Sequence, residues 1–88
     1  MNEWKIVFSE QAVKQFSKLD RYTQTFIHSW IIKHLKNVID PRKIGKPLVG
    51  NHKGKWRYRV GDYRLLCQII DNEITIIIIT VGHRKEVY

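Results

Sequence analysis

Cysteine and long apolar runs are scarce in this sequence, and each scarcity excludes a class of protein. Cys67 is the only cysteine among 88 residues, so no internal disulfide can form and a disulfide-stapled secreted scaffold is excluded. The apolar run at residues 76–79 is far too short to cross a bilayer, and no signal peptide is recognisable. These features predict a cytoplasmic protein with no membrane partner.

Motifs for metal, cofactor or nucleophilic chemistry are also missing. Three of the four histidines, His28, His34 and His52, show no metal-ligand spacing, and there is no Gly-rich phosphate loop or Ser/His/Asp arrangement. Cys67 lies within an apolar segment, which is typical of a small core residue rather than of a catalytic thiol. We therefore expect neither a metal nor a cofactor.

Acidic residues are few, with 8 Asp and Glu against 16 Lys and Arg, which gives a net charge of +8. The imbalance is concentrated in residues 42–64, which contain eight basic side chains and only Asp62 as an acid. Clustered positive charge attracts polyanions and accelerates their capture. Nucleic acid or an acidic protein would satisfy this pattern, and a solvated basic face kept for solubility is the simpler alternative.

The length predicts one domain, residues 1–88, and the hydrophobic content of 43% is that of a folded protein. Apolar periodicity predicts the order β-α-α-β-β-β. The expected elements are a strand at 4–8, a helix at 9–19, a second helix ending before Pro41, and strands at 56–60, 63–70 and 74–81. The economical arrangement is an α+β domain in which a small antiparallel sheet packs against an N-terminal helical hairpin.

Local signals support these boundaries. Ser9 and Asp20 are suited to cap the two helices, and Asp40 precedes a proline and therefore avoids the α region. Residues 41–55 contain both prolines and three of the five glycines, which predicts a loop, with a short strand near Leu48 and Val49. Tight turns at residues 61–62 and 71–72 would join the last three strands as a meander.

Arginines line the first hairpin of this predicted sheet. Strand alternation puts Arg57 and Arg59 on one face and Tyr58 on the other. Arg64 begins the neighbouring strand close to Arg59, although the register decides whether the two share a face. Guanidinium groups bind phosphate oxygens in a bidentate manner, so this group favours an anionic ligand. The alternative is an exposed strand face that protects a sheet edge from aggregation.

The end of the chain adds groups suited to RNA cleavage. His83 and Arg84 follow the last predicted strand, and Tyr88 lies four residues further on. Cleavage through the 2′-hydroxyl of RNA needs a proton acceptor, a proton donor and stabilisation of a charge-rich phosphorane. Arginines supply the stabilisation, and His83 is the local side chain suited to proton transfer near neutral pH. An isolated histidine is nevertheless more often a surface or hydrogen-bonding residue.

Two segments carry a resemblance to a known family. Residues 56–70 (WRYRVGDYRLLCQII) and 81–88 (VGHRKEVY), preceded by Lys46-Pro47-Leu48 and Gly50, resemble the RelE branch of the RelE/ParE toxin superfamily. The resemblance implies the toxin of a type II toxin–antitoxin system, a metal-independent endoribonuclease that cleaves translated mRNA in the A site of the 70S ribosome. It also implies a cognate RelB-like antitoxin that blocks the basic site, and contact with operator DNA only through the antitoxin complex.

The resemblance also implies roles for individual residues. Arg64 matches the transition-state-stabilising arginine, Arg84 the arginine assigned to the leaving group or phosphate, and Tyr88 the C-terminal tyrosine that orients or deprotonates the 2′-hydroxyl. The catalytic group implied is Arg64, His83, Arg84 and Tyr88, and the RNA-binding group is Arg57, Arg59, Lys46, Lys53, Lys55 and Lys85.

Three positions depart from the best-studied branch of the family. Arg57 and Arg59 stand where that branch has two lysines, and His83 replaces another lysine. Arginine in practice cannot release its proton, so we expect His83 and Tyr88 to share the proton transfers. Two other functions remain open at this stage: a ParE-like inhibitor of DNA gyrase, and a non-catalytic basic module that binds RNA or protein.

Overall fold

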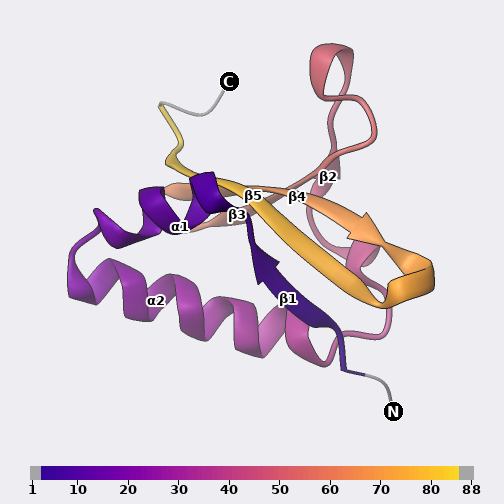
Figure 1. The fold of residues 1–88 in the computed structure, drawn as a ribbon, viewed down its shortest axis with the longest axis horizontal. Helices are drawn as coiled ribbons and strands as arrows, with labels where there is room; N and C mark the ends of the chain where they lie inside the picture. The colour runs from indigo at the N-terminus through magenta and orange to yellow at the C-terminus, as the bar shows by residue number, and fades with distance from the viewer. Residues whose placement is uncertain (1–2, 86–88) are drawn as a thin grey trace.

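Two helices cover one face of a five-stranded mixed sheet with the strand order β1-β5-β4-β3-β2 (Figure 1). The computed structural model describes residues 3–85. The helices are α1 (Glu10–Ser17) and α2 (Arg21–Ile31), and the strands are β1 (Lys5–Phe8), β2 (Lys46–Pro47), β3 (Trp56–Val60), β4 (Tyr63–Ile70) and β5 (Thr75–His83). None of the helices in the described part of the chain is long and apolar enough to cross a membrane.

Both helices begin at the predicted caps. The Ser9 side chain accepts a hydrogen bond from the backbone N–H of Ala12 at 3.0 Å, and Asp20 accepts one from that of Thr23 at 3.2 Å. Each cap satisfies a donor that the first turn of a helix leaves without a partner. The Ser9 hydroxyl also donates to the carbonyl of Ile79 at 2.8 Å, so the start of α1 is fixed to β5.

The second helix ends earlier than the proline predicts. Regular α-helix stops at Ile31 and continues as a wider π-helical turn over Ile32–Lys36. The carbonyl of Lys36 accepts a hydrogen bond from the backbone N–H of Trp4 at 2.7 Å, so the helix end is bonded to the segment before β1. A tertiary contact therefore ends the helix, and Asp40 instead caps a short 3-10 turn over Pro41–Lys43.

The predicted meander is confirmed. Strands β3 and β4 have the expected bounds, and β5 runs two residues past its predicted end. The short strand expected near Leu48 and Val49 is present but lies slightly earlier, at Lys46–Pro47. The turn before β5 is a 3-10 turn that ends with Ile74 in the left-handed region (φ 50°), which β-branched residues rarely adopt and sequence patterns therefore miss.

The expectation of a wholly antiparallel sheet needs correction. β1 pairs in parallel with β5, with Lys5 opposite Thr75 and Phe8 opposite Ile78. The chain passes from β1 through the two helices before it forms the other strands. The N-terminal strand lies beside the last strand, β5, and not beside the first hairpin (Figure 1). Alternation of apolar residues shows that a strand forms, but it does not show which edge the strand joins.

The core lies between the helices and the sheet. Its largest fully buried side chains include Ile27 and Ile31 from α2, Tyr58 from β3 and Ile78 from β5. The Tyr58 hydroxyl donates to the carbonyl of Pro41 at 2.6 Å, which fixes the segment after α2 to the sheet. Cys67 is fully buried, and burial raises the pKa of its thiol, as expected for a core residue rather than a reactive one.

A surface ion pair links the loop after α2 to the turn before β5. The guanidinium of Arg42 donates to both carboxylate oxygens of Asp71 at 2.8 and 2.9 Å, and these bonds lower the pKa of Asp71 below its usual value of 3.8. A carboxyl whose pKa is lowered by folding stabilises the folded state at pH values above its ordinary pKa. This contribution is lost as the pH falls through the lowered pKa of the folded state.

We therefore expect wild type to exceed Asp71→Asn slightly in stability at neutral pH, and the difference to vanish in acid. Urea unfolding of both proteins across this pH range measures the effect, which is small because the pair is exposed. Glu73→Gln, which removes a carboxyl from the same turn, is the control. A difference between wild type and Asp71→Asn that stays constant with pH would contradict the assignment.

Candidate nucleic-acid site

Basic side chains meet on the sheet face that points away from the helices. Arg59 pairs directly with Arg64 across the β3–β4 hairpin, and Lys46 pairs with Arg57 across β2 and β3. Residues paired directly in an antiparallel sheet share a face, so the register left open by the sequence brings Arg59 and Arg64 together. We call this surface, formed by Lys46, Arg57, Arg59 and Arg64, the arginine face.

Arg64 is the most constrained member of the arginine face. It is half-buried, and its Nε atom is buried without a hydrogen-bond partner among residues 3–85. Within the same residues, no carboxylate forms an ion pair with Arg57, Arg59 or Arg64. A buried donor without an acceptor costs on the order of 1–3 kcal/mol, which an anionic ligand would offset. This arrangement is suited to an anionic ligand and differs from a structural salt bridge.

Arg84 lies at the end of the sheet, next to the β3–β4 turn. Its backbone N–H donates to the carbonyl of Asp62 at 2.8 Å, and its guanidinium lies 3.8 Å from the Asp62 carboxylate. Arg64 pairs with Gly82, so the Arg84–Asp62 bond extends the ladder of β4 and β5 by one step beyond His83. Arg84 itself lies in the turn that follows β5. The structure thus places the two arginines at the same end of the sheet.

His83 lies on the opposite side from Arg64. It pairs with Tyr63, and the two rings make an edge contact with centroids 5.4 Å apart. This pair follows Leu65 and Val81 on the core side of the sheet, whereas Arg64 and Gly82 occupy the other side. The sequence suggested that His83 and Arg64 converge. In the structure His83 is near that end of the sheet but not on the arginine face.

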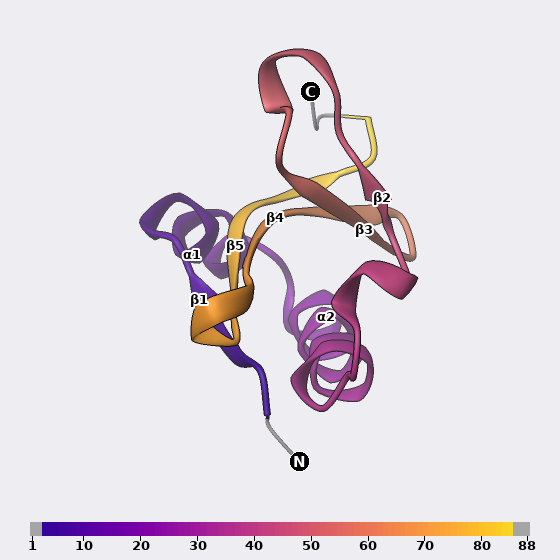
Figure 2. The same ribbon diagram turned by 90° about the vertical axis from the view of Figure 1, so that its right-hand side faces the viewer.

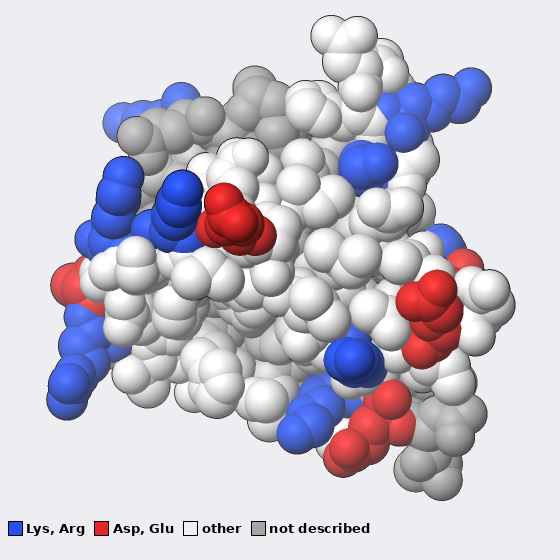
Figure 3. All heavy atoms as spheres, viewed as in Figure 1, with Lys and Arg blue, Asp and Glu red and all other residues white. Residues whose placement is uncertain are grey.

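The remaining predicted residues lie around this face. Lys53 and Lys55 belong to the connection between β2 and β3, which rises from the sheet on the side away from the helices (Figure 2). Lys85 is exposed just after β5. Tyr88, expected to act on the 2′-hydroxyl, lies outside the described residues. The face seen in Figure 1 has a largely uncharged centre, and its Lys and Arg side chains lie mostly nearer the margins together with several Asp and Glu side chains (Figure 3).

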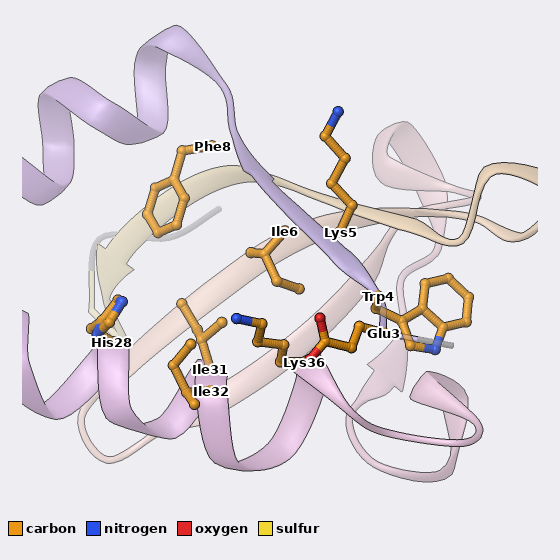
Figure 4. A pocket seen from close by; sticks show the side chains of 9 residues that line it. All are labelled: Glu3, Trp4, Lys5, Ile6, Phe8, His28, Ile31, Ile32 and Lys36. Carbon is orange, nitrogen blue, oxygen red and sulfur yellow. The ribbon is translucent and has the colours of Figure 1, made fainter. Parts of the chain in front are cut away.

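A groove between β1 and α2 is a second concave region, with a volume of about 480 Å³. Ile6 and Phe8 of β1 and Ile31 of α2 form much of its wall, and Lys5, His28 and Lys36 are among the residues at its border (Figure 4). It lies on the helix side of the sheet, away from the arginine face. Its lining is mainly apolar, and it contains none of the arginines that form the arginine face.

Two side chains that the sequence did not single out lie beside the arginine face. Trp30 and His34 of the second helical segment line a hollow at the edge of β3 together with Lys46, Arg57 and Arg59. In the sequence, His34 stands out only as a possible metal ligand, and Trp30 has no predicted role. Their spacing of four residues, which puts two rings on one face of a helix, was the available signal.

Comparison with known proteins gives a consistent assignment. Residues 6–88 match the family described as the ParE toxin of the type II toxin–antitoxin system parDE. The chain is 30% identical over 84 residues to a putative RelE-like toxin protein of Escherichia coli, covering 93% of this chain and 84% of that one. It is 41% identical over 49 residues to toxin RelG of Mycobacterium tuberculosis, a match that spans only 56% of either chain.

Solved structures show the same fold. The RelBE2 toxin–antitoxin complex of Mycobacterium tuberculosis contains a chain with a TM-score of 0.85 and 29% identity, which matches 98% of this chain and 97% of that one. The isolated RelE toxin of Escherichia coli has a TM-score of 0.71 and 21% identity, covering 91% of this chain and 83% of its own, and supports the fold alone. The chain therefore belongs to the RelE/ParE superfamily, the toxins of type II toxin–antitoxin systems.

Proposed function

We propose that this toxin is a ribosome-dependent endoribonuclease that cleaves translated mRNA in the ribosomal A site. The observation that carries the proposal is the Arg59–Arg64 pair, whose guanidinium groups have no carboxylate partner within residues 3–85, with the buried Nε of Arg64 unsatisfied. Such a group is suited to hold a phosphodiester and to stabilise the extra negative charge of the phosphorane. A protein that only binds does not need a half-buried arginine of this kind.

The remaining cations have distinct parts in this proposal. Arg84, at the same end of the sheet as Arg64, binds the scissile phosphate or neutralises the leaving 5′ oxygen. The exposed Arg59 and Lys46, with the half-buried Arg57, bind flanking phosphates. Lys53, Lys55 and Lys85 extend the positive surface toward the RNA backbone. Contacts of this kind position the nucleic acid without reading its sequence.

Proton transfer is assigned to Tyr88 and His83. Tyr88 lies outside the described residues; positive charge stabilises a phenolate, so among the arginines of such a site it would be suited to accept the 2′ proton. His83 lies on the other side of the sheet from Arg64 and contacts Tyr63, so it reaches the RNA only around the end of β5. We expect His83→Ala to slow cleavage by about 10-fold to 100-fold, at or below the usual contribution of a general acid or base.

Single-turnover cleavage on programmed ribosomes as a function of pH measures this effect. His28→Ala, which removes a histidine from the distant groove between β1 and α2, is the matched control and should cleave as wild type does. A cleavage rate in His83→Ala equal to that of wild type would remove the histidine from proton transfer and leave Tyr88 in that role.

A cognate RelB-like antitoxin is the proposed partner. The RelBE2 structure of Mycobacterium tuberculosis is a toxin–antitoxin complex. A toxin of the same fold needs a similar inhibitor to protect the cell that produces it. We infer that the antitoxin covers the arginine face, because a bound acidic segment would offset the repulsion among its cations. Operator DNA is bound only by the toxin–antitoxin complex.

Primer extension on a defined mRNA, incubated with programmed 70S ribosomes and the toxin, tests the proposal. Cuts confined to the A-site codon, which require ribosomes and disappear on addition of the antitoxin, are the expected result. The family match to ParE makes inhibition of DNA gyrase the second candidate function. A folded toxin that produces no cuts but blocks gyrase supercoiling would replace the first function with the second.

A further inference from the structure

The hollow at the edge of β3 combines aromatic rings with positive charge. It has a volume of about 330 Å³, and its lining contains Trp30 and His34 together with Lys46, Arg57 and Arg59. None of the residues that line it is acidic. The hollow exists because β2 pairs only with Trp56 and Arg57, which leaves the rest of β3 uncovered by a neighbouring strand.

The aromatic wall of this hollow is held in place from the core. The Trp30 ring contacts two other rings, with its centroid 5.7 Å from that of fully buried Tyr58 and 4.8 Å from that of His34. The His34 ring is tilted by 38° from the Trp30 ring, and both side chains are half-buried. Each ring therefore keeps an accessible surface, while Tyr58 restricts the position of Trp30 and Trp30 restricts that of His34.

We propose that this hollow is a subsite for one unpaired RNA base, stacked against His34 and Trp30, with the adjoining phosphates held by Arg57 and Lys46. Stacking on aromatic rings beside a basic groove is the usual way in which proteins hold single-stranded nucleic acid. The hollow shares Arg57 and Arg59 with the arginine face, so an RNA strand held there continues into it. The inference rests on the proposed function for its ligand class, and it adds residues that the proposed cleavage does not use.

The chemistry favours RNA over an acidic peptide as the occupant. An acidic peptide would use the three cations but would leave the two stacked rings without a role. A nucleotide uses both, because its phosphate pairs with the cations and its base has a π face for the rings. The predicted contact is tolerant of base identity, since every base stacks.

The test is equilibrium binding of a short single-stranded oligoribonucleotide, 2′-O-methylated to prevent cleavage, to the free protein. The comparison series replaces each nucleotide in turn by an abasic residue. We expect wild type to lose about fivefold to 100-fold in affinity at one position of the series, the usual effect of one stacked base. In His34→Ala that position-specific loss should become clearly smaller, because only the Trp30 ring remains to stack on the base.

Matched variants separate stacking from folding. His28→Ala changes the same residue type on the same helix, faces the groove between β1 and α2, and should keep the wild-type pattern. Trp30→Leu should also reduce the discrimination, but Trp30 contacts Tyr58, so the thermal unfolding of this variant is measured first. His34 is the decisive variant, and the shift of its ring proton resonances on addition of intact but not abasic RNA is an independent readout.

Two outcomes overturn the subsite: an abasic series without a position-specific loss in wild type, or the same loss in His34→Ala. An acidic antitoxin segment whose binding requires His34 while RNA binding does not would assign the hollow to protein instead. Because the assay needs neither ribosomes nor cleavage, its result is independent of the proposed reaction. A base-dependent signal without ribosomal cleavage would leave the subsite standing in a protein that only binds RNA.

Discussion

Arg64→Ala should reduce the rate of ribosome-dependent mRNA cleavage by about 100-fold to 1000-fold, the usual cost of removing one donor that stabilises a developing oxyanion. The expected effect is large because Arg64 faces Arg59 directly and has its buried Nε without a partner among the described residues. Single-turnover primer extension with saturating toxin measures the chemical step separately from ribosome binding.

The controls for this prediction use the same residue type. Arg21→Ala removes an exposed arginine from the first turn of α2 and should leave the single-turnover rate within about twofold of wild type, since surface substitutions away from special features have small effects. Arg64→Lys keeps the charge but loses the planar fork, so an intermediate rate is expected. A normal rate in Arg64→Ala, with wild-type unfolding behaviour, would show that the arginine face is only a docking surface.

Gly45→Ala should destabilise the protein by about 2–5 kcal/mol, combining left-handed backbone strain with overpacking. Gly45 has φ +78°, and a Cβ there would lie 2.4 Å from the carbonyl oxygen of Arg57 and 2.8 Å from Cδ1 of Tyr58. Those atoms belong to β3 and cannot move without disturbing the sheet edge. Urea unfolding gives the free energy, and RNA binding should weaken in parallel because the hollow beside β3 is built on this segment.

Gly50→Ala is the matched control for that prediction. Gly50 also has a positive φ, of +68°, but a Cβ there would meet nothing within 4 Å. Its substitution should therefore cost only about 1–2 kcal/mol, the backbone strain alone. The difference between the two variants isolates the close approach of residue 45 to β3. Equal losses in both would mean that the contact is relieved by movement of the loop.

Local rules determined much of the structure from the sequence. Ser9 and Asp20 act as caps because their side chains reach backbone donors within three residues, which depends on no distant contact. The strands over 56–60 and 63–70 follow from alternation and from Gly61, which adopts φ +61° at the turn between them. These signals also fixed the shared face of Arg57 and Arg59, and the concentration of positive charge is a property of the composition.

Tertiary contacts decided the rest, because they join residues that are distant in the chain. Three features depend on register and topology: the parallel pairing of β1 with β5, the backbone bond from Trp4 to Lys36 after α2, and the direct pairing of Arg59 with Arg64. The same register places His83 beside Tyr63, away from Arg64, and sets Trp30 and His34 next to the basic residues of β3. Sequence therefore indicated which residues are candidates for the chemistry. The side-chain period, which repeats every two residues in a strand, left the folded sheet to decide which of them lie together.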